Sequence, residues 1–424
     1  MKNKAKLYAE DVRKVLIIGG GGREHAMGKK IHDQNPSIEL FFAPGNAGTA
    51  MLGQNIRQRT IGELRQFCLS REIDFTIVGP EQELVQGITD DFLANDLAIF
   101  GPHKAAAALE GSKVFAKEFM HKHGVKTAAY HTFRHYVDAK RFLENNHTYP
   151  LVIKADGLAA GKGVIIVHDS FEAQNAVKDL MRNEKFGEAG SQIVIEEFLK
   201  GYEVSVLSIY NGHEIAPMIS AKDHKKIGER ETGLNTGGMG VVAPNPLFSE
   251  KDMQAFVKDI LQPTQQGLLQ DNLQFSGIIF FGLMVTSFGI YLLEYNVRMG
   301  DPETQAVLPL MQSNFLHQLI AAYNGEALDL QFSQQHSCCV VLASGGYPGS
   351  YQTGFEIRGI SQVQSQVIMA GVSGSEGHYK TAGGRVLSIV SVADSLATAR
   401  QKAYEDAAKI RFDYAYYRKD IGVV

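Results

Sequence analysis

Between residues 15 and 102, short apolar runs alternate with stretches whose apolar positions recur at the spacing of an amphipathic helix. Runs that are apolar at successive positions are typical of strands buried on both faces, and such strands joined by helices form parallel sheets. Each run is followed by glycine or proline, and ligands bind beyond the carboxyl ends of parallel strands. We therefore expect an α/β domain that binds a ligand at this edge. The predicted strands are 15–18, 38–42, 75–78 and 97–100, and the predicted helices are 23–34, 61–72 and 83–95.

Beyond residue 102 the pattern predicts three further groups of elements. Residues 103–123 are predicted as one helix. Two strands joined by a glycine-rich turn, with a covering helix, then indicate a small lid. A larger group and a last block follow. The lid would hold strands 151–154, 163–167 and 193–195 and helix 171–182; the larger group strands 203–210, 277–285 and 290–295 and helix 249–270; the last block strands 338–343, 366–370 and 386–392 and helix 394–410.

The composition is that of an ordinary globular protein. The 424 residues are 44% hydrophobic and 21% charged, with a net charge of −4, so two to four domains are expected and neither nucleic acid nor a membrane surface is indicated as partner. The three cysteines, Cys68, Cys338 and Cys339, are interpreted as buried small apolar residues because no zinc-ligand spacing is present. Residues 1–13 lack the apolar core of a signal peptide, and no run is long enough to span a membrane, so we expect a cytoplasmic protein.

Four consecutive glycines, Gly19 to Gly22, follow the first predicted strand and open the first predicted helix. This geometry directs backbone N–H groups and the positive end of the helix at an anion. A dinucleotide site is excluded by spacing, because Glu24 or His25 falls where the third glycine of Gly-x-Gly-x-x-Gly is required. The loop therefore predicts a site for the phosphate of a smaller ligand, and a tight turn without a ligand is the alternative.

A turn of small residues between two predicted strands carries two lysines, Lys154 and Lys162. Small residues let the backbone close over a polyphosphate, and lysines neutralise its charge. The segment is not a Walker A motif, because Gly161-Lys162-Gly163 precedes a strand instead of a helix. The prediction is a polyphosphate-binding hairpin, and a mobile hairpin with solvated lysines is the alternative.

Three acidic residues, Glu196, Glu197 and Glu203, follow the last apolar strand of the predicted lid. Carboxylates in this place are able to hydrogen-bond an adenine amino group and ribose hydroxyls. Taken alone, such acids are more often solvated surface charges.

Glu294 and Asn296 are two residues apart at the end of a predicted strand, so their side chains share one face. Paired oxygen ligands suit Mg²⁺, which needs few protein ligands beside phosphate oxygens and water. Arg298 continues the same alternation. The pair predicts a magnesium site, and an ordinary polar strand end is the alternative.

The segment from Gly233 to Gly240 holds too many glycines for a strand or a helix. It is predicted to be a loop whose backbone approaches a ligand. A flexible loop without a role is the alternative.

Taken in order, these motifs resemble the ATP-grasp superfamily and, within it, the glycinamide ribonucleotide synthetase family. Any one motif is weak, but together they cover the chain from about residue 13. The resemblance rests on residues 149–154, 195–199 and 293–298, and extends through 21–26, 44–48, 78–81, 111–113, 223–225, 235–240, 300–305, 346–349 and 383–387.

The resemblance implies an α/β fold in which a parallel-sheet domain precedes an ATP-grasp fold with a small lid subdomain, followed by a C-terminal α+β domain. The implied divisions are an N-terminal substrate-binding domain over 1–112, an ATP-grasp main domain over 113–130 and 200–328, a lid over 131–199 and a C-terminal domain over 329–424.

The resemblance also implies a reaction of purine biosynthesis. The glycine carboxylate would attack the γ-phosphate of ATP, giving glycyl phosphate and ADP, and the amine of phosphoribosylamine would then expel phosphate to give glycinamide ribonucleotide. The implied partners are ATP, glycine, phosphoribosylamine and Mg²⁺ or Mn²⁺, with no nucleic acid and no membrane. A monomer or weak homodimer is expected.

Residue roles follow from the matched motifs. Lys154 and Arg298 would act on the reacting groups, and Glu294 and Asn296 would hold the metal. The implied ATP site comprises Lys113, Lys154, Gly161, Lys162, Gly163, Glu196, Glu197, Phe198, Leu199 and Glu203, and the implied substrate site comprises Gly21, Gly22, Arg23, Glu24, Asn46, Glu81, Asp223, Asn235, Thr236, Gly237, Gly238 and Arg298.

Several positions depart from the family pattern, and several of them fall in the substrate half. None removes a group assigned to ATP or the metal. The departures are Gly20 for Asn, Leu234 for Pro, Met299 for Phe, Tyr416 for His, and Gln82-Glu83 for Ala-Pro.

Three alternatives remain beside the implied enzyme. A sister ligase for another amine or amino acid predicts loss of substrate-loop residues, yet Arg23, Asn46 and Asn235 are present. A non-catalytic nucleotide-binding protein predicts loss of Lys154, Glu294 or Asn296, and all three are present. A nicotinamide oxidoreductase requires the dinucleotide fingerprint that the glycine spacing denies.

Overall fold

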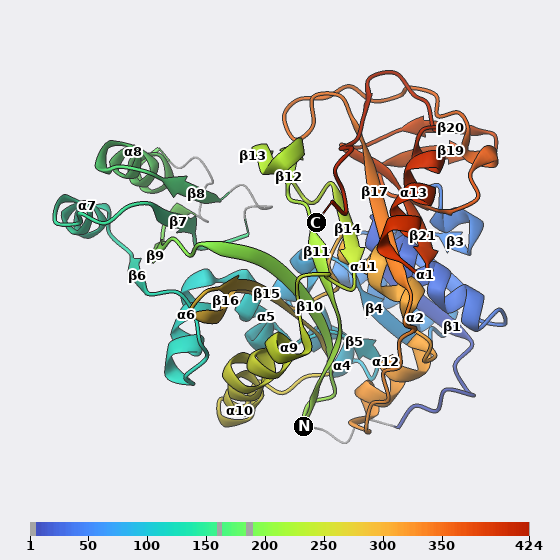
Figure 1. Ribbon diagram of the computed structural model, residues 1–424. Coiled ribbons are helices and arrows are strands. Elements are labelled where there is room, and N and C mark those ends of the chain that lie inside the picture. Colours follow the sequence, from blue (N-terminus) through green and yellow to red (C-terminus); the bar gives the residue numbers. More distant parts are fainter. Residues whose placement is uncertain (1–5, 159–162, 184–189, 424) are drawn as a thin grey trace.

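The computed structural model describes residues 6–158, 163–183 and 190–423. The N-terminal part forms a five-stranded parallel sheet in the order β3-β2-β1-β4-β5 (Figure 1). Its central strands are buried almost throughout, as expected for a sheet covered on both faces. The elements are β1 (Lys14–Gly19), α1 (Gly22–Gln34), β2 (Glu39–Pro44), η1 (Thr49–Met51), β3 (Gln54–Asn55), α2 (Ile61–Arg71), β4 (Phe75–Val78), α3 (Glu81–Gln86), α4 (Ile88–Ala94) and β5 (Ile99–Phe100).

Two predicted helices are each divided in two. The helix expected over 83–95 is interrupted at Gly87, whose φ of 96° is a left-handed conformation. The helix expected over 103–123 is α5 (Lys104–Gly111) and α6 (Lys113–Lys122), separated by Ser112 in an extended conformation. The Ser112 side chain accepts the Phe115 N–H at 3.0 Å, which starts the second helix with an N-cap.

A separate four-stranded antiparallel sheet in the order β6-β9-β7-β8 carries two helices and projects to the left in Figure 1. Its first strand and first helix were not predicted. The lysine-bearing turn is only partly described, because Gly161 and Lys162 lie outside the described residues. The elements are β6 (Tyr130–Phe133), α7 (Tyr136–Glu144), β7 (Leu151–Ala155), β8 (Val164–Val167), α8 (Ser170–Met181) and β9 (Ile193–Glu197).

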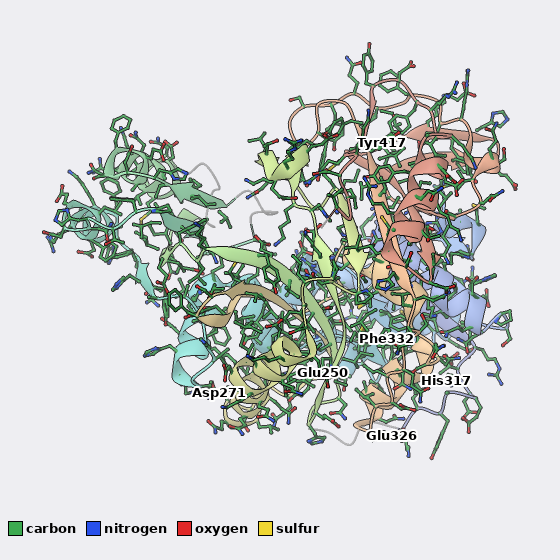
Figure 2. All side chains as sticks on the ribbon, in the orientation of Figure 1. Glu250, Asp271, His317, Glu326, Phe332 and Tyr417 are labelled. Atoms are coloured by element: carbon green, nitrogen blue, oxygen red, sulfur yellow. The ribbon has the colours of Figure 1, made fainter. Side chains whose placement is uncertain are left out.

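The largest sheet has nine strands in the order β16-β15-β10-β11-β14-β17-β21-β18, with β22 paired to β17. It runs through the middle of the molecule, and side chains fill the space between it and the covering helices (Figure 2). The predicted helix over 249–270 is one continuous helical run with a π-helical turn at its centre. The elements up to residue 324 are β10 (Gly201–Tyr210), β11 (Ile215–Asp223), β12 (Lys226–Gly228), η3 (Glu229–Glu231), β13 (Thr232–Asn235), β14 (Gly240–Ala243), α9 (Glu250–Phe256), η4 (Val257–Leu261), α10 (Gln262–Gln270), β15 (Gly277–Thr286), β16 (Gly289–Asn296), α11 (Glu303–Val307), η5 (Leu308–Leu310) and α12 (Phe315–Asn324).

The C-terminal block continues this sheet, because β14 pairs with β17 over Gly240–Ala243. It also packs on the N-terminal part, where His25 Nδ1 accepts the Met369 N–H at 2.8 Å. The remaining elements are β17 (His336–Ser344), η6 (Ile360–Gln362), β18 (Gln366–Met369), β19 (Val372–Ser375), β20 (His378–Thr381), β21 (Arg385–Ala393), α13 (Leu396–Ala407) and β22 (Ala415–Tyr416).

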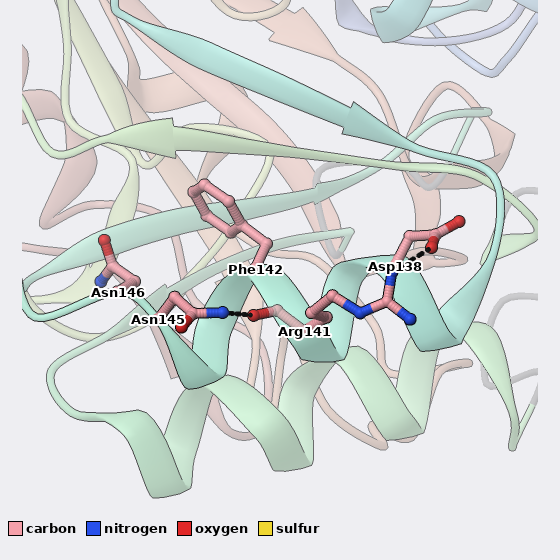
Figure 3. A pocket seen from close by; sticks show the side chains of 5 residues that line it. All are labelled: Asp138, Arg141, Phe142, Asn145 and Asn146. Carbon is pink, nitrogen blue, oxygen red and sulfur yellow. Dashed lines mark hydrogen bonds and ion pairs between the residues drawn. The ribbon is translucent and has the colours of Figure 1, made fainter.

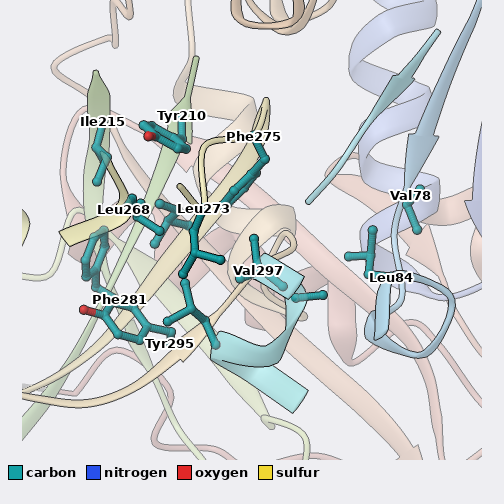
Figure 4. Close-up of a cluster of buried hydrophobic side chains, with 14 of the residues drawn as sticks. Val78, Leu84, Tyr210, Ile215, Leu268, Leu273, Phe275, Phe281, Tyr295 and Val297 are labelled. Carbon is teal, nitrogen blue, oxygen red and sulfur yellow. The ribbon is translucent and has the colours of Figure 1, made fainter. Parts of the chain in front are cut away.

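The core joins the N-terminal part to the central sheet. Val78 and Leu84 belong to the same buried cluster as Phe281 and Tyr295, whose rings meet edge to face at 5.7 Å (Figure 4). The three cysteines are free and buried, as predicted. Within the described ranges, no helix is long and apolar enough to cross a membrane.

The expectation that the Gly233–Gly240 segment contains no strand is wrong at both ends, because Gly240 is also the first residue of β14. Gly233, Leu234 and Asn235 lie in β13, which pairs with β12 in a short exposed hairpin. A high glycine content argues against a buried strand, which needs side chains to pack, but not against an exposed hairpin.

Candidate active site

Four cations gather around one carboxylate, that of Glu294: Lys113, Lys154 and Arg298 were predicted site residues, and Lys225 was not. Burial raises the pKa of Glu294, but the positive charges of Lys225, Lys154, Lys113 and Arg298 outweigh it and hold the pKa below its ordinary value. Glu294 is therefore ionised at neutral pH. Three of these cations also have a second acidic partner, Glu196 for Lys154, Glu203 for Lys225 and Glu110 for Arg298. The site is therefore a network of paired charges whose ammonium and guanidinium donors suit a polyphosphate.

The strand that carries Glu294 has a β-bulge next to it. Gly282 pairs with Glu294 and Leu283 pairs with Leu292, so Leu293 is the extra residue. Before the bulge Leu292 points into the core, and after it Tyr295 does, so Glu294 and Asn296 turn to the open face. Bulges re-aim side chains in this way next to functional sites.

Lys154 and Lys113 approach the site from β7 and from the start of α6. The Lys154 ammonium lies 2.9 Å from Glu196 Oε1 and donates to the free carbonyl of Leu293 at 3.2 Å. Lys113 Nζ donates to Gly157 O at 3.0 Å, and burial lowers its pKa. Both lysines thus flank the described part of the predicted phosphate-binding turn.

The acids at the end of β9 have different surroundings. Glu196 is buried, whereas Glu197 is exposed and accepts the Ala129 N–H at 2.8 Å. Phe198, which follows, is 40% exposed. Glu203 Oε2 lies 2.7 Å from Lys225 Nζ. The structure therefore places Glu196 with the lysines and leaves Glu197 and Phe198 at the surface.

Arg298 is held by acids from two helices. Its guanidinium lies 3.0 Å from Glu110 Oε1 and 3.5 Å from Glu81 Oε2, and it donates to Asn296 Oδ1 at 3.3 Å. Glu81 Oε2 also lies 3.5 Å from an Arg23 nitrogen. The carboxylate of Glu81 therefore connects the glycine-rich loop of the N-terminal part with the end of β16.

A cavity of about 280 Å³ opens at the carboxyl ends of β1 and β2. This is the edge at which the sequence predicts a ligand. Three of its polar lining residues, Gln58, Arg59 and Glu83, were not predicted. The other lining residues include Gly19, Gly20, Gly21, Arg23, Glu24, Pro44, Pro80 and Asp301.

Beneath this cavity, Glu24 is only 2% exposed, and glycines make room for it. Its carboxylate accepts the Gly21 N–H at 2.6 Å and pairs with Arg23 Nε at 2.6 Å. A Cβ on Gly79 would lie 2.0 Å from Glu24 Oε1, and one on Gly22 would lie 2.5 Å from Gln305 Nε2. The glycines of this site therefore fit buried polar side chains as well as facing the cavity.

Asn46 connects the glycine-rich loop with the C-terminal block. Its amide donates to Gly20 O at 3.0 Å and to Met369 O at 2.9 Å. On the other side of the cavity, Arg385 lies 3.4 Å from Asp301 Oδ1. Arg385 and Asp301 each lie in a motif of the resemblance, 383–387 and 300–305, but neither was assigned a role from the sequence.

The predicted substrate loop is held by its own backbone and by Arg385. Thr236 Oγ1 donates to Lys225 O at 2.8 Å and accepts the Gly238 N–H at 3.0 Å. Gly237 O accepts from Arg385 Nη1 at 2.5 Å. Asn235 is exposed in β13, away from the ion pairs described above.

Asp223, at the end of β11, is partly buried beside this loop. Burial raises its pKa well above the ordinary value, and the carboxylate of Glu303 adds to the effect. A Cβ on Gly238 would lie 2.7 Å from Asp223 Oδ1, so Asp223 lies next to the predicted substrate loop.

A larger hollow of about 400 Å³ lies on α7, and none of the predicted site residues line it (Figure 3). Its polar groups satisfy one another, since Arg141 pairs with Asp138 at 3.8 Å and its carbonyl accepts from Asn145 Nδ2 at 2.8 Å. Volume alone therefore does not locate the chemistry in this molecule, and the convergence of charges does.

Three family models match the chain, described as the N, ATP-grasp (A) and C domains of phosphoribosylglycinamide synthetase, over residues 13–110, 111–304 and 337–424. A phosphoribosylamine–glycine ligase of Fusobacterium nucleatum is 49% identical over 97% of this chain and 98% of its own length. A crystal structure of phosphoribosylamine–glycine ligase from Thermotoga maritima is 33% identical, with a TM-score of 0.85 over 96% of this chain and 100% of that one.

A biotin carboxylase domain of 2-oxoglutarate carboxylase from Hydrogenobacter thermophilus, solved with MgADP and bicarbonate, has a TM-score of 0.75. It covers 96% of this chain and 91% of that chain at 14% identity, so the likeness concerns the fold alone. Together the family models and the structural likeness confirm the predicted fold class.

Proposed function

Because the chain belongs to the phosphoribosylamine–glycine ligase family of purine biosynthesis, we propose that it joins glycine to 5-phosphoribosylamine through a glycyl phosphate intermediate. The chain is an ATP-grasp ligase. The proposed products are glycinamide ribonucleotide, ADP and phosphate. The cations around Glu294 are the observation that carries this proposal, since phosphoryl transfer needs positioning and charge neutralisation more than a covalent protein group.

The residues at the end of β16 fit a magnesium or manganese ion. Glu294 is kept ionised and shares an open strand face with Asn296. In the part of the chain that the structure describes, no group of three or more His, Cys, Asp or Glu is placed to hold a metal. Two oxygen ligands suit an ion that completes its shell with phosphate oxygens and water. The ion, when bound, would screen the γ-phosphate from the attacking carboxylate.

The protein groups have separate tasks in this proposal. Lys113 and Lys154 hold ATP phosphates, and Gly161, Lys162 and Gly163 are assigned to the same phosphate site from the sequence. Arg298 is the donor for the glycine carboxylate and the acyl phosphate, because its planar guanidinium suits bidentate recognition. The adenosine half would contact Glu197, Phe198, Leu199 and Glu203, whereas Glu196 of the proposed ATP site faces the lysines Lys154 and Lys117.

The cavity of the N-terminal part is the proposed site for the sugar phosphate. Gly21 and Gly22 lie at the start of α1, where a phosphate is favoured; the Gly21 N–H donates to Glu24, so the Gly22 N–H is the proposed backbone donor, and Arg59 adds a cation. Arg23, held by Glu24 and Glu81, faces the same space. The remaining proposed substrate residues are Asn46, Asp223, Asn235, Thr236, Gly237 and Gly238.

We also propose the division of labour among the parts of the chain. Residues 1–112 bind the amine, residues 113–130 and 200–328 bind ATP, residues 131–199 close over it, and residues 329–424 support the N-terminal part. A monomer or weak homodimer is the proposed state.

The test is ATP-dependent phosphate release with Mg²⁺ and freshly generated phosphoribosylamine, with and without glycine. The variant Glu294→Gln is expected to lose roughly a hundredfold or more in rate, because metal-assisted charge stabilisation is worth several kcal/mol. Glu250→Gln, an exposed acid at the start of α9, is the matched control (Figure 2). Phosphate release that does not require both substrates, or that survives in Glu294→Gln, refutes the proposal.

A further inference from the structure

Lys117, on α6, is a lysine whose side chain is 2% exposed. Its ammonium lies 3.2 Å from Glu196 Oε2 and donates to Thr127 Oγ1 at 2.6 Å. The Tyr130 ring centre is 5.8 Å away, and the Tyr130 hydroxyl donates to Lys117 O at 3.0 Å. Lysine is almost never buried unless it is paired, so the ion pair with Glu196 is what keeps a charge here.

Glu196 has a second cation on its other oxygen. Lys154 Nζ lies 2.9 Å from Oε1, and the three side chains are 2%, 2% and 7% exposed for Lys117, Glu196 and Lys154. Lys154 is the most open of the three. Lys117 lies on α6, whereas Glu196 and Lys154 lie on β9 and β7 of the four-stranded sheet, so the cluster joins this sheet to a helix outside it.

The three groups in contact are one carboxylate and two ammonium groups, an excess of one positive charge among themselves, and the carboxylate of Glu294 also attracts Lys154. Burial lowers the pKa of Lys117 to about 8, with Glu196 opposing and Lys154 adding to the effect. A buried excess charge is costly until a counter-ion arrives. Lys154, at 7% the most exposed of the three side chains, is the group through which an anion would reach that charge.

We propose that Lys117 is a positioning residue for nucleotide phosphate, which neutralises Glu196 so that Lys154 keeps its positive charge available for a phosphate oxygen. Without Lys117, Glu196 and Lys154 would form a neutral pair with each other, and the attraction for phosphate would fall. The inference rests on the proposed function, since it takes ATP as the anion. It assigns Glu196 to charge balance instead of adenine contact.

The test measures binding of Mg–ATP by titration calorimetry on the full chain, without glycine. Lys117→Met is expected to weaken binding about tenfold or more, the scale of one charge-assisted hydrogen bond. Lys117→Arg, which keeps the charge, is expected to bind within a few-fold of the unmodified chain. Lys122→Met, at the exposed end of the same helix where the lysine pairs with Asp271, is the matched control (Figure 2).

The decisive variant is the double substitution Lys117→Met with Glu196→Gln. It removes one charge of each sign, so the cluster again carries one net positive charge on Lys154. Binding is expected to recover to within a few-fold of the unmodified chain, with kcat following. Lys117→Met alone keeps Glu196 paired with Lys154, and the double variant leaves Lys154 with the Leu293 carbonyl and the nearby Glu294. A urea midpoint measured for each variant separates a loss of folding from a loss of affinity.

Each outcome decides between distinct claims. Recovery in the double variant supports the charge-balance role, which a merely structural loss would not reproduce. Binding by the double variant that is equal to or weaker than that of Lys117→Met, or unchanged binding by Lys117→Met, overturns the inference. If Lys117→Met does not fold, weak binding by the double variant overturns it on its own. Absence of Mg–ATP binding by the unmodified chain refutes the proposed function instead.

Discussion

Glu110 joins the N-terminal half of the molecule to the end of β16, and its replacement is the sharpest test of that connection. The Glu110 side chain is 6% exposed, and its Oε1 lies 3.0 Å from Arg298 Nη2. Its Oε2 accepts the Val297 N–H at 2.7 Å. Glu110→Ala would remove both contacts and leave two buried donors without this partner.

The expected loss in the free energy of unfolding depends on the hydrogen-bond and ion-pair partners that each donor keeps. Breaking a buried ion pair from one side costs about 3–5 kcal/mol. Arg298 keeps Glu81 at 3.5 Å and is itself 17% exposed, which softens the loss. An expected decrease of about 3 kcal/mol in the free energy of unfolding results. Glu110→Gln should cost about 1–2 kcal/mol, because one carboxamide oxygen can accept from only one of the two donors.

The assay is urea denaturation, with the shift in midpoint multiplied by the shared m-value. Glu356→Ala, which removes an exposed pair with Arg358, is the control and should change the free energy of unfolding by less than about 1 kcal/mol. Ligation kinetics should show a lower kcat with little change in the KM for ATP, because Glu110 holds Arg298 and is not a proposed contact of the nucleotide. A Glu110→Ala midpoint equal to that of the control would refute the reasoning.

Two further predictions concern buried groups near the glycine-rich loops. Burial lowers the pKa of His25 and of His224 to about 4, so the folded chain keeps both neutral while the unfolded chain protonates them below about 6.5. Stability should therefore be full above pH 6.5 and fall by up to about 3 kcal/mol per histidine as the pH drops towards 4, and a urea midpoint that is constant between pH 7.5 and 5 would contradict this. Gly79→Ala, whose Cβ would lie 2.0 Å from Glu24 Oε1, should lower stability by about 1–3 kcal/mol and raise the KM for phosphoribosylamine. Gly62 lies in α2, and a Cβ there would have no atom within 4 Å, so Gly62→Ala should stabilise the folded chain by about 0.5–1 kcal/mol. Equal changes in melting temperature for Gly79→Ala and Gly62→Ala would contradict both expectations.

The strands of the N-terminal sheet were predictable because each is a continuous apolar run. β4, for example, is four residues long and entirely buried, so its pattern is visible without knowledge of its neighbours. The division of the helix at Ser112 had a local signal as well, since serine is a preferred N-cap. It was missed because the apolar period continues across the break, and periodicity alone does not detect a change in helix axis.

The face of a strand residue was harder to predict. Glu294 and Asn296 were expected on one face from their spacing, and the structure agrees. That this face is the open one depends on the bulge at Leu293, which has no signal in the sequence of β16 and is defined by the register against β15. A bulge is defined by how two strands pair, so the sequence of one strand does not reveal it.

Residues that touch a ligand and residues that set the charge of its site therefore differ in how far the sequence predicts them. Lys154 lies in a local motif whose small residues suit a polyphosphate, so its neighbours in the chain already indicate its task. Glu110 accepts a hydrogen bond from Val297, 187 positions away in the sequence, and Lys117 on α6 forms an ion pair with Glu196 on β9. Within their own helices both look like ordinary polar positions, and only burial beside a distant charge distinguishes them. The energy of a buried charge depends on its partner, so these residues could be identified only once the fold had brought the partners together.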